Sequence, residues 1–467
     1  MGRGINKGVH LYININHLND LVKSEENNRD DLTRVFHWLE SFLVSMESFI
    51  NRYNDDVYIE KLNGSRIHIV IYDNQDIGKN FVEIVGYAFM LVSEMGNTQR
   101  YQKINHLNIS MGADYGIFNE FEFFYSKTNF SEDTTIGYPA NYAAKIQNIA
   151  NDNEMLITQR VIKLLSGSSV SQFISTSRVT SERLSAARNR YPNLPEFSIV
   201  DIRNLNAFNL SKQNKTKFEN EIQNYRDRQN NKNNTFDSID FTESRKQVNF
   251  DELSLRQPNK IKAVVIYGDI RGFTKQFRED GSNLSEMTNK TILALNDMYL
   301  SVINRNASHV QFQGDRESAL RNRYGEFDYV LEGLFVAFDM LDKIRQSSFE
   351  IGIGCSIGTV FASRVGMKGR KHNLILGNSV IQADYAEDAI ATNNEIAITK
   401  EMYDYLCSTE NSKYKKIMIK IFIPKGNHYV TSKGLKDWRN EVSIIYQDEN
   451  ASRAKQNDSY KPWSFDE

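Results

Sequence analysis

The sequence has few cysteines and no long apolar segment. Its two cysteines, Cys355 and Cys407, belong to no paired spacing, which excludes a disulfide framework and a cysteine-based zinc site. No run of about 18 uncharged apolar residues occurs, and the first residues lack the apolar core of a signal peptide. We therefore expect no membrane span and a cytoplasmic location.

The chain also lacks an excess of either charge. Its 57 Lys and Arg residues nearly balance 59 Asp and Glu residues, giving a net charge of -2. No general basic field is available to hold nucleic acid or an anionic membrane. Hydrophobic residues make up 40% and charged residues 25%, as in globular proteins, and 467 residues exceed one typical domain.

Two stretches of the chain repeat one order of predicted elements. The first predicts a strand at 9–15, a helix at 32–50, a hairpin at 57–72, a helix at 81–92, a strand at 107–111 and a helix from 138. The second predicts the same order at 261–267, 292–302, 309–312, 330–341, 351–357 and 378–391. We expect duplicated domains at 1–205 and 259–447, joined by a polar linker at 206–258 with one short helix, and a polar tail at 448–467.

Two aspartates of the second stretch follow predicted strands. Asp269 stands in Gly-Asp-Ile-Arg-Gly-Phe-Thr, and Asp315 stands in Gln-Gly-Asp at a predicted hairpin. Two carboxylates on adjacent strands can hold divalent cations, and the small residues after Asp269 let backbone N–H groups approach phosphate oxygens. Each aspartate could also be an ordinary turn residue.

The first stretch has the same turns without the carboxylates, since Asn14 and Ser65 occupy the two positions. It keeps a different set of polar residues. Lys61 lies four positions before Ser65, and Thr134 lies three before Gly137.

A helical segment from Tyr138 in the first stretch carries Asn141 and Lys145. Asn141 could also cap the adjoining helix. In the second stretch Ile381 and Tyr385 occupy the positions of Asn141 and Lys145, and Gln311 occupies that of Lys61. Each stretch has lost what the other keeps, which favours a single working site built from both.

Together these motifs resemble the class III adenylyl and guanylyl cyclases over residues 5 to 165 and 260 to 447. The resemblance implies an α/β (α+β) fold in which two tandem ferredoxin-like domains, each with helices on one face of its sheet, form an intramolecular pseudo-dimer. The resemblance also implies a role for each candidate residue. Two divalent cations, Mn²⁺ or Mg²⁺, would bind to Asp269, Asp315 and the backbone of Ile270, and the triphosphate would bind to Ile270, Gly272, Phe273 and Thr274. Asn141 would orient the ribose, Lys145 would replace the arginine that stabilises the transition state, and Lys61 and Thr134 would contact the base.

The resemblance implies that a nucleoside triphosphate is cyclised to a 3′,5′-cyclic nucleotide. Lys61 with Thr134 resembles an adenine-reading pair, yet a lysine can equally donate to the O2 carbonyl of a pyrimidine. Lys145 departs from the purine-cyclase pattern, and we favour a resemblance to the pyrimidine cyclases of bacterial anti-phage defence, whose product activates a separate effector. An adenylate cyclase and a catalytically dead nucleotide-binding module are the alternatives. Either a monomer or a homodimer would bring the two sets together.

Overall fold

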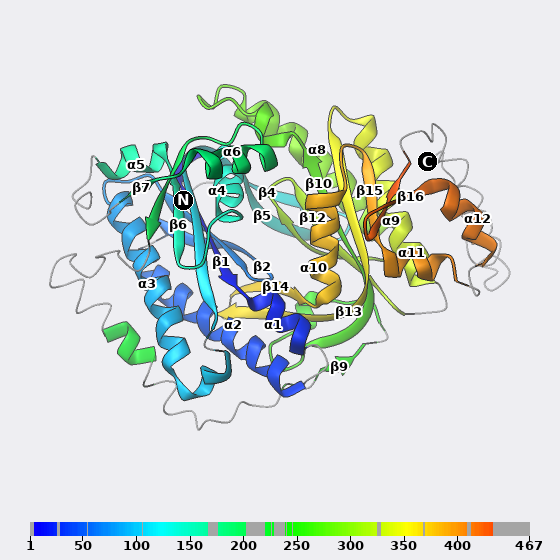
Figure 1. The fold of residues 1–467 in the computed structure, drawn as a ribbon, viewed down its shortest axis with the longest axis horizontal. Helices are drawn as coiled ribbons and strands as arrows, with labels where there is room; N and C mark the ends of the chain where they lie inside the picture. The colour runs from blue at the N-terminus through cyan, green and yellow to red at the C-terminus, as the bar shows by residue number, and fades with distance from the viewer. Residues whose placement is uncertain are drawn as a thin grey trace.

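The computed structural model contains two similar α/β halves side by side, the first drawn blue through cyan to green and the second green through yellow to orange (Figure 1). It describes residues 4–25, 29–53, 55–104, 106–166, 176–201, 220–225, 227, 239, 241–244, 246–324, 328–367, 369–408 and 412–432. The predicted tail at 448–467 and much of the predicted linker lie outside these residues.

The first half contains a sheet with strand order β2-β3-β1-β4-β6-β8-β7, and β5 pairs with β4. The order of β1 to β4 is that of a ferredoxin-like βαββαβ unit, which confirms the predicted fold class. Its elements are β1 (Gly4–Asn16), α1 (Leu18–Glu25), α2 (Arg29–Ile50), β2 (Val57–Asn63), β3 (Arg66–Tyr72), α3 (Ile77–Asn97), β4 (Asn108–Tyr125), β5 (Phe130–Ile136), α4 (Tyr138–Gln147), β6 (Glu154–Thr158), α5 (Gln159–Ser166), β7 (Ser177–Arg178), α6 (Ser181–Arg190) and β8 (Phe197–Asp201).

The second half repeats this arrangement in the order β11-β12-β10-β13-β15-β17-β16, with β14 on β13 and β9 on β10. Its elements are β9 (Thr242–Glu243), β10 (Asn259–Arg271), α8 (Leu284–Ile303), β11 (Ser308–Gln313), β12 (Arg316–Asn322), α9 (Tyr329–Gln346), β13 (Glu350–Met367), β14 (Arg370–Leu376), α10 (Asn378–Tyr385), β15 (Glu395–Thr399), α11 (Lys400–Leu406), α12 (Ser412–Ile421), β16 (Phe422–Lys425) and β17 (His428–Thr431).

Strand alternation decides which side chains enter each core. Val9, Leu11 and Ile13 of β1 are fully buried in the core that α2 and α3 cover. Tyr12 and Asn14, between and after them, therefore project from the opposite face of the sheet. The apolar periodicity of α2 and α3 matches that core, as the sequence predicts.

The expectation that helices cover only one face of each sheet is wrong for one helix of each half. A Cβ atom on Gly112 of β4 would lie 2.4 Å from the carbonyl oxygen of Ala143 in α4. The same contact in the second half is 2.3 Å, between Gly354 of β13 and Ala383 of α10. Because both glycines face away from the main core, α4 and α10 lie on the opposite faces of their sheets. The periodicity of a short helix shows which of its sides is apolar but does not show which sheet face it covers.

The two halves share small irregularities as well as element order. β2 and β11 each contain a β-bulge before the hairpin turn, at Glu60 and at Val310. The turns that follow have a glycine with positive φ, 55° at Gly64 and 64° at Gly314. Such matched details support a duplication.

The halves are in direct contact within one chain. Asn119 of β4 donates to Thr288 of α8 at 2.8 Å, and the backbone N–H of Gly366 donates to Glu40 of α2 at 2.8 Å. Described residues of the predicted linker also pack, since Phe241 lies against Phe36 of the first half and Phe361 of the second.

Among the described residues, no helix has both the length and the apolar character needed to cross a membrane.

Candidate functional site

The two predicted metal ligands lie next to each other on the face of the second sheet that carries α10. Asp269 of β10 is paired with Arg316, the residue directly after Asp315. The core-facing position before it is Gly268, where a Cβ would lie 2.5 Å from the sulfur of Met340. The local sequence therefore packs Gly268 against α9 and directs Asp269 to the other side of the sheet. We call Asp269 and Asp315 the carboxylate pair.

Burial and mutual repulsion act on the carboxylate pair. Asp315 is 6% exposed, and the Asp269 side chain is 28% exposed. Burial raises the pKa of both carboxyl groups, and the charge of Asp269 raises the pKa of Asp315 further. A bound cation would relieve this repulsion.

Two arginines lie beside the carboxylate pair, but they also bind carboxylates in and directly after α10. Arg271 is 3.3 Å from Asp269 and 2.6 Å from Glu387, while Arg316 contacts Asp384 at 2.6 Å and Glu387 at 2.8 Å. Glu387 has a pKa of about 8, because burial and Asp269 raise it more than the arginines lower it. The arginines thus leave the carboxylate pair only partly neutralised.

The predicted phosphate turn follows β10. Ile270 and Phe273 have buried side chains, with 2% and 3% exposure, so only their backbone groups can serve a ligand. Gly272 has φ of 69° and a Cβ there would touch nothing within 4 Å, so conformation rather than space favours glycine.

Helix α4 of the first half brings Lys145 to the carboxylate pair of the second half. Its Nζ donates to the Thr274 hydroxyl at 2.8 Å. Burial lowers the pKa of Lys145, while the charges of Asp315 and Asp269 oppose that change. The structure therefore brings Asp269, Asp315, Thr274 and Lys145 together, from both halves of the chain.

A small pocket that is partly open to solvent lies between the halves beside this cluster. Asn141, one helical turn before Lys145, and the predicted base residue Lys61 both line it. We call it the shared pocket, lined by Tyr12, Glu60, Lys61, Asn63, Arg66, His68, Thr135, Ala140, Asn141, Gln313 and Gly314.

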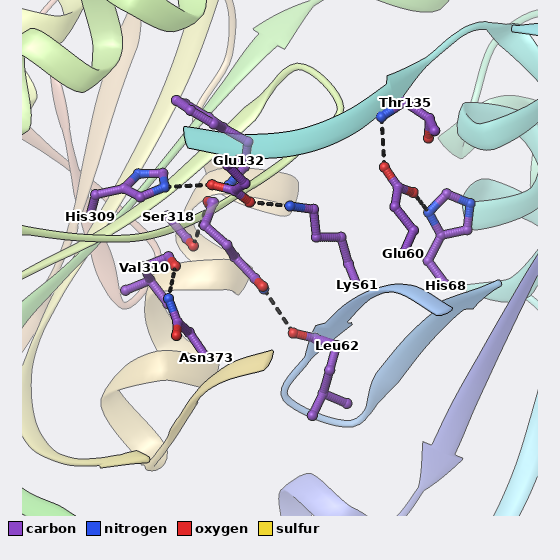
Figure 2. Close-up of polar contacts among 12 residues, drawn as sticks. Glu60, Lys61, Leu62, His68, Glu132, Thr135, His309, Val310, Ser318 and Asn373 are labelled. Carbon is purple, nitrogen blue, oxygen red and sulfur yellow. Dashed lines mark hydrogen bonds and ion pairs between the residues drawn. The ribbon is translucent and has the colours of Figure 1, made fainter. Parts of the chain in front are cut away.

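Lys61 is held by an ion pair that the sequence did not predict. Figure 2 shows its ammonium group against Glu132 of β5, which also receives His309 of β11 at 2.8 Å. The backbone N–H of Phe312 donates to the same carboxylate at 3.0 Å. Glu132 therefore links the two halves and keeps Lys61, only 9% exposed, at the pocket edge.

The predicted base residue Thr134 is fully buried, and its hydroxyl has no hydrogen-bond partner in the described part of the chain. Its neighbour Thr135 lines the shared pocket instead. Adjacent residues of a strand point to opposite faces, so a one-residue difference in alignment exchanges the two threonines.

The positions that correspond to the carboxylate pair in the first half and to Lys145 in the second half do not form a second copy of this site. Asn14 accepts a hydrogen bond from Ser65 at 2.7 Å and donates one to Asn16 at 2.7 Å, so these side chains are engaged within the protein. Tyr385 of α10 is 52% exposed and its ring lies near that of His428. Neither an anionic pair nor a cationic partner stands at these positions.

The donor set fits a divalent cation that is shared with a bound phosphate. Mg²⁺ is commonly held by one or two carboxylates, with substrate phosphates and water completing the coordination. The carboxylate pair supplies two such ligands, and no cluster of three or more His, Cys, Asp or Glu side chains suited to a metal occurs in the described ranges. The residues therefore fit a cation that enters with the nucleotide.

Sequence reasoning missed Tyr12, Glu60 and His68, which line the shared pocket. Glu60 directly precedes Lys61 in the sequence, but its direction depends on the bulge in β2, which has no signal in the strand pattern.

No family model matches the sequence, and no curated protein matches it. A solved structure described as a class III adenylyl cyclase-like ATP-binding protein from Pseudomonas aeruginosa matches 94% of this chain and 90% of its own, with a TM-score of 0.67 and 16% identity. The chain has a class III cyclase-like fold. Two further solved structures, the adenylyl cyclase CyaB from P. aeruginosa and the guanylyl cyclase Cya2, each match 38% of this chain with a TM-score of 0.31 and 17% identity. The match covers 98% of the CyaB chain and 97% of the Cya2 chain. We refer to the halves below as cyclase-like halves.

Proposed function

We propose that this protein is a nucleotide cyclase with one active site shared by its cyclase-like halves, and that it converts a pyrimidine nucleoside triphosphate into a 3′,5′-cyclic nucleotide and diphosphate. The observation that carries the proposal is the position of Lys145. It belongs to the first half, yet it contacts Thr274 and lies in the field of Asp269 and Asp315 of the second half. Complementary groups from opposite halves thus lie beside one shared pocket.

In the proposed mechanism, the chain positions the substrate along α4. The base enters the shared pocket, Asn141 holds the ribose, and Thr274 with the backbone from Ile270 to Phe273 holds the triphosphate. The 3′-oxygen loses its proton to water and attacks the α-phosphorus, and the bond from that phosphorus to the bridging oxygen breaks. Lys145 opposes the negative charge that grows on the α-phosphate oxygens.

The carboxylate pair, with the backbone of Ile270, would hold two divalent cations, Mn²⁺ or Mg²⁺. When bound, such cations lower the pKa of the 3′-hydroxyl and stabilise the departing diphosphate. The mutual repulsion of Asp269 and Asp315 favours this binding, because each cation replaces a repulsive contact with attractive ones.

The pyrimidine assignment rests on the departure at Lys145. Lys61, which is ion-paired with Glu132, does not distinguish the bases, because a lysine can serve adenine or a pyrimidine. As part of the same proposal, the cyclic product is a second messenger that activates a separate effector in anti-phage defence. An adenylate cyclase is the closest enzymatic alternative.

A nucleotide-binding module without turnover is the second candidate. The whole-chain structural match is described as an ATP-binding protein, not as a cyclase. Lysine at position 145 lacks the planar fork of arginine, which would weaken the stabilisation of a pentacovalent phosphorus.

The test is to incubate the purified protein with each of the four ribonucleoside triphosphates and Mn²⁺, and to identify products by mass spectrometry. A 3′,5′-cyclic pyrimidine nucleotide that is lost in Asp269→Asn supports the proposal. Cyclic AMP as the sole product would remove the pyrimidine assignment. Nucleotide binding without any cyclic product would favour the binding module.

A further inference from the structure

Arg271, two residues after Asp269 in β10, contacts the carboxylate pair but has no role in the mechanism above. Its Nη1 lies 3.3 Å from Oδ2 of Asp269 and 2.6 Å from Oε1 of Glu387. Its Nη2 donates to the backbone carbonyl oxygens of Glu387 and Ala391, the latter at 3.1 Å. The π-helical turn Ala386–Ile390, which follows α10, therefore fixes the guanidinium, and the guanidinium holds one oxygen of Asp269.

Gly352 of β13 provides the space for this guanidinium. It is paired with Asp269 across the sheet. A Cβ atom at this position would lie 2.0 Å from Nη2 and 2.3 Å from Nε of Arg271. The three atoms nearest to that Cβ all belong to Arg271, so a larger residue at position 352 must displace the arginine side chain.

The first half of the chain provides a comparison within the same molecule. The strand pair β1–β4 aligns with the pair β10–β13 through Gly112 and Gly354, the two glycines that lie against α4 and α10. On this alignment the first half has Asn14, Asn16 and Ser110 where the second half has Asp269, Arg271 and Gly352.

The fourth position of the comparison is on the helix side. A Cβ at Gly354 would lie 2.7 Å from the Cβ of Glu387, and a Cβ at Gly112 would lie 2.7 Å from the Cβ of Gln147. Gln147 therefore occupies the place of Glu387. Where the second half has Asp, Arg, Gly and Glu, the first half has Asn, Asn, Ser and Gln.

Neutral hydrogen bonds alone join strand to helix in the first half. Asn16 accepts from Asn14 at 2.7 Å and from Ser110 at 2.9 Å, and Ser110 accepts from Gln147 at 3.2 Å. Helix α4 nevertheless packs on its sheet as closely as α10 does. Packing of the helix does not require the arginine, so the presence of Arg271 beside Asp269 points to a task at the cation site.

We infer that Arg271 is a positioning residue, which holds the Asp269 carboxylate in the orientation that binds Mn²⁺ or Mg²⁺ and is itself held by Glu387 in the space left by Gly352. This inference rests on the proposed function, since it takes the carboxylate pair as the cation site. Removing a partner that orients a ligating group typically weakens metal binding by about 10–100-fold. The charge of Arg271 alone would act in the opposite direction, because a cation 3.3 Å from Asp269 repels a metal ion.

The test is titration of Mn²⁺ alone into the purified full-length chain, with free Mn²⁺ measured by electron paramagnetic resonance. Asp269→Asn identifies the binding that belongs to the carboxylate pair. Arg271→Gln should weaken that binding by about tenfold or more. An unchanged or higher Mn²⁺ affinity in Arg271→Gln would overturn the inference, because the arginine would then act at most as a nearby charge. Binding that Asp269→Asn leaves unchanged would overturn it as well.

Gly352→Ser displaces the guanidinium without removing it, by introducing the residue of the first half. It should weaken Mn²⁺ binding about as much as Arg271→Gln does. The double variant should bind no more weakly than either single variant, because the serine acts only through Arg271. Additive losses would contradict this route. If Arg271→Gln does not fold, the Mn²⁺ affinity of Gly352→Ser decides.

Arg305→Gln is the matched control, since it removes another buried ion pair of the second half. Arg305, directly after α8, lies 2.7 Å from Asp339 of α9. This variant should lower the unfolding midpoint and keep the wild-type Mn²⁺ affinity. Failure of the proposed function is a separate result. It would appear as Mn²⁺ binding that weakens in Arg271→Gln while the wild type forms no cyclic product from any ribonucleoside triphosphate.

Discussion

Lys145 makes the contact on which the proposed reaction depends. We expect Lys145→Ala to lower kcat by about 100-fold or more, because one electrostatic donor at a developing charge contributes on that order. Lys145→Arg should retain activity, since arginine keeps the charge and adds a planar fork. Steady-state cyclisation rates with the preferred triphosphate measure both effects. A Lys145→Ala enzyme with wild-type kcat would show that this lysine only occupies space on α4.

His309 should make stability fall at alkaline pH. Burial lowers its pKa, but Glu317 and Glu132 outweigh burial and raise it to about 9. A group whose pKa is higher in the folded state stabilises fully below its unfolded value of about 6.5, and this contribution is lost as pH rises through 9.

Between pH 6.5 and 9.5 the wild type should therefore lose about 1–3 kcal/mol of unfolding free energy that His309→Gln does not lose. Urea unfolding at both pH values measures the difference. Identical pH dependence in the two proteins would contradict the assignment of this charge to His309.

Some site residues could be predicted from the sequence and others could not. Asp269, Asp315, Asn141 and Lys145 stand in short motifs whose spacing fixes their places on strands, turns and helices. Thr134 and Thr135 could not be told apart, because strand alternation reverses a side chain with a shift of one residue. The role of Glu132 could not be predicted either, since its partners Lys61 and His309 come from distant parts of the chain.

At the level of elements, the close contact between α4 and β4 should matter more for catalysis than the same contact between α10 and β13. Alanine at Gly112 or Gly354 would bring a Cβ within 2.4 Å or 2.3 Å of a helix carbonyl. Each substitution should cost about 1–3 kcal/mol of stability, as overpacking does. Gly112→Ala should lower kcat more than Gly354→Ala, because α4 carries Asn141 and Lys145, whereas a Cβ at Gly354 meets Glu387, which reaches Asp269 only through Arg271.

Gly354→Ala is thus a matched control for Gly112→Ala. Unfolding midpoints and cyclisation rates of both variants are the measurements. Equal losses of kcat would mean that the helices act through general stability and not through the placement of α4.

Element order was predictable because apolar periodicity differs between helices and strands, as at Val9 to Ile13 and along α2. The 18-residue lengths of β4 and β13 could not be predicted, because the C-terminal part of each strand extends beyond the core and pairs with β5 or β14. The placement of α4 depended on Gly112, whose significance becomes visible only once Ala143 is seen to lie against it.

At the scale of the whole molecule, one chain should form the complete site without a second copy of the protein. We expect a mixture of Asp269→Asn and Asn141→Ala chains to show no more cyclisation than either variant alone, because each intact molecule would still lack one required group. A site assembled between chains would recover up to about a quarter of wild-type activity by random pairing, assuming standard cyclic two-fold assembly. Rates measured before and after co-refolding of the mixture decide between the two.

The direct contacts between the halves, such as Asn119 with Thr288 and Glu132 with His309, have a consequence for control of the proposed cyclase. Translation delivers both sets of ligands in a fixed ratio, so dilution cannot separate them. Specific activity should stay constant down to a few copies per cell. For the proposed cyclase we therefore expect regulation to act on the arrangement of the halves or on the entry of substrate, and not on the recruitment of one protomer to another.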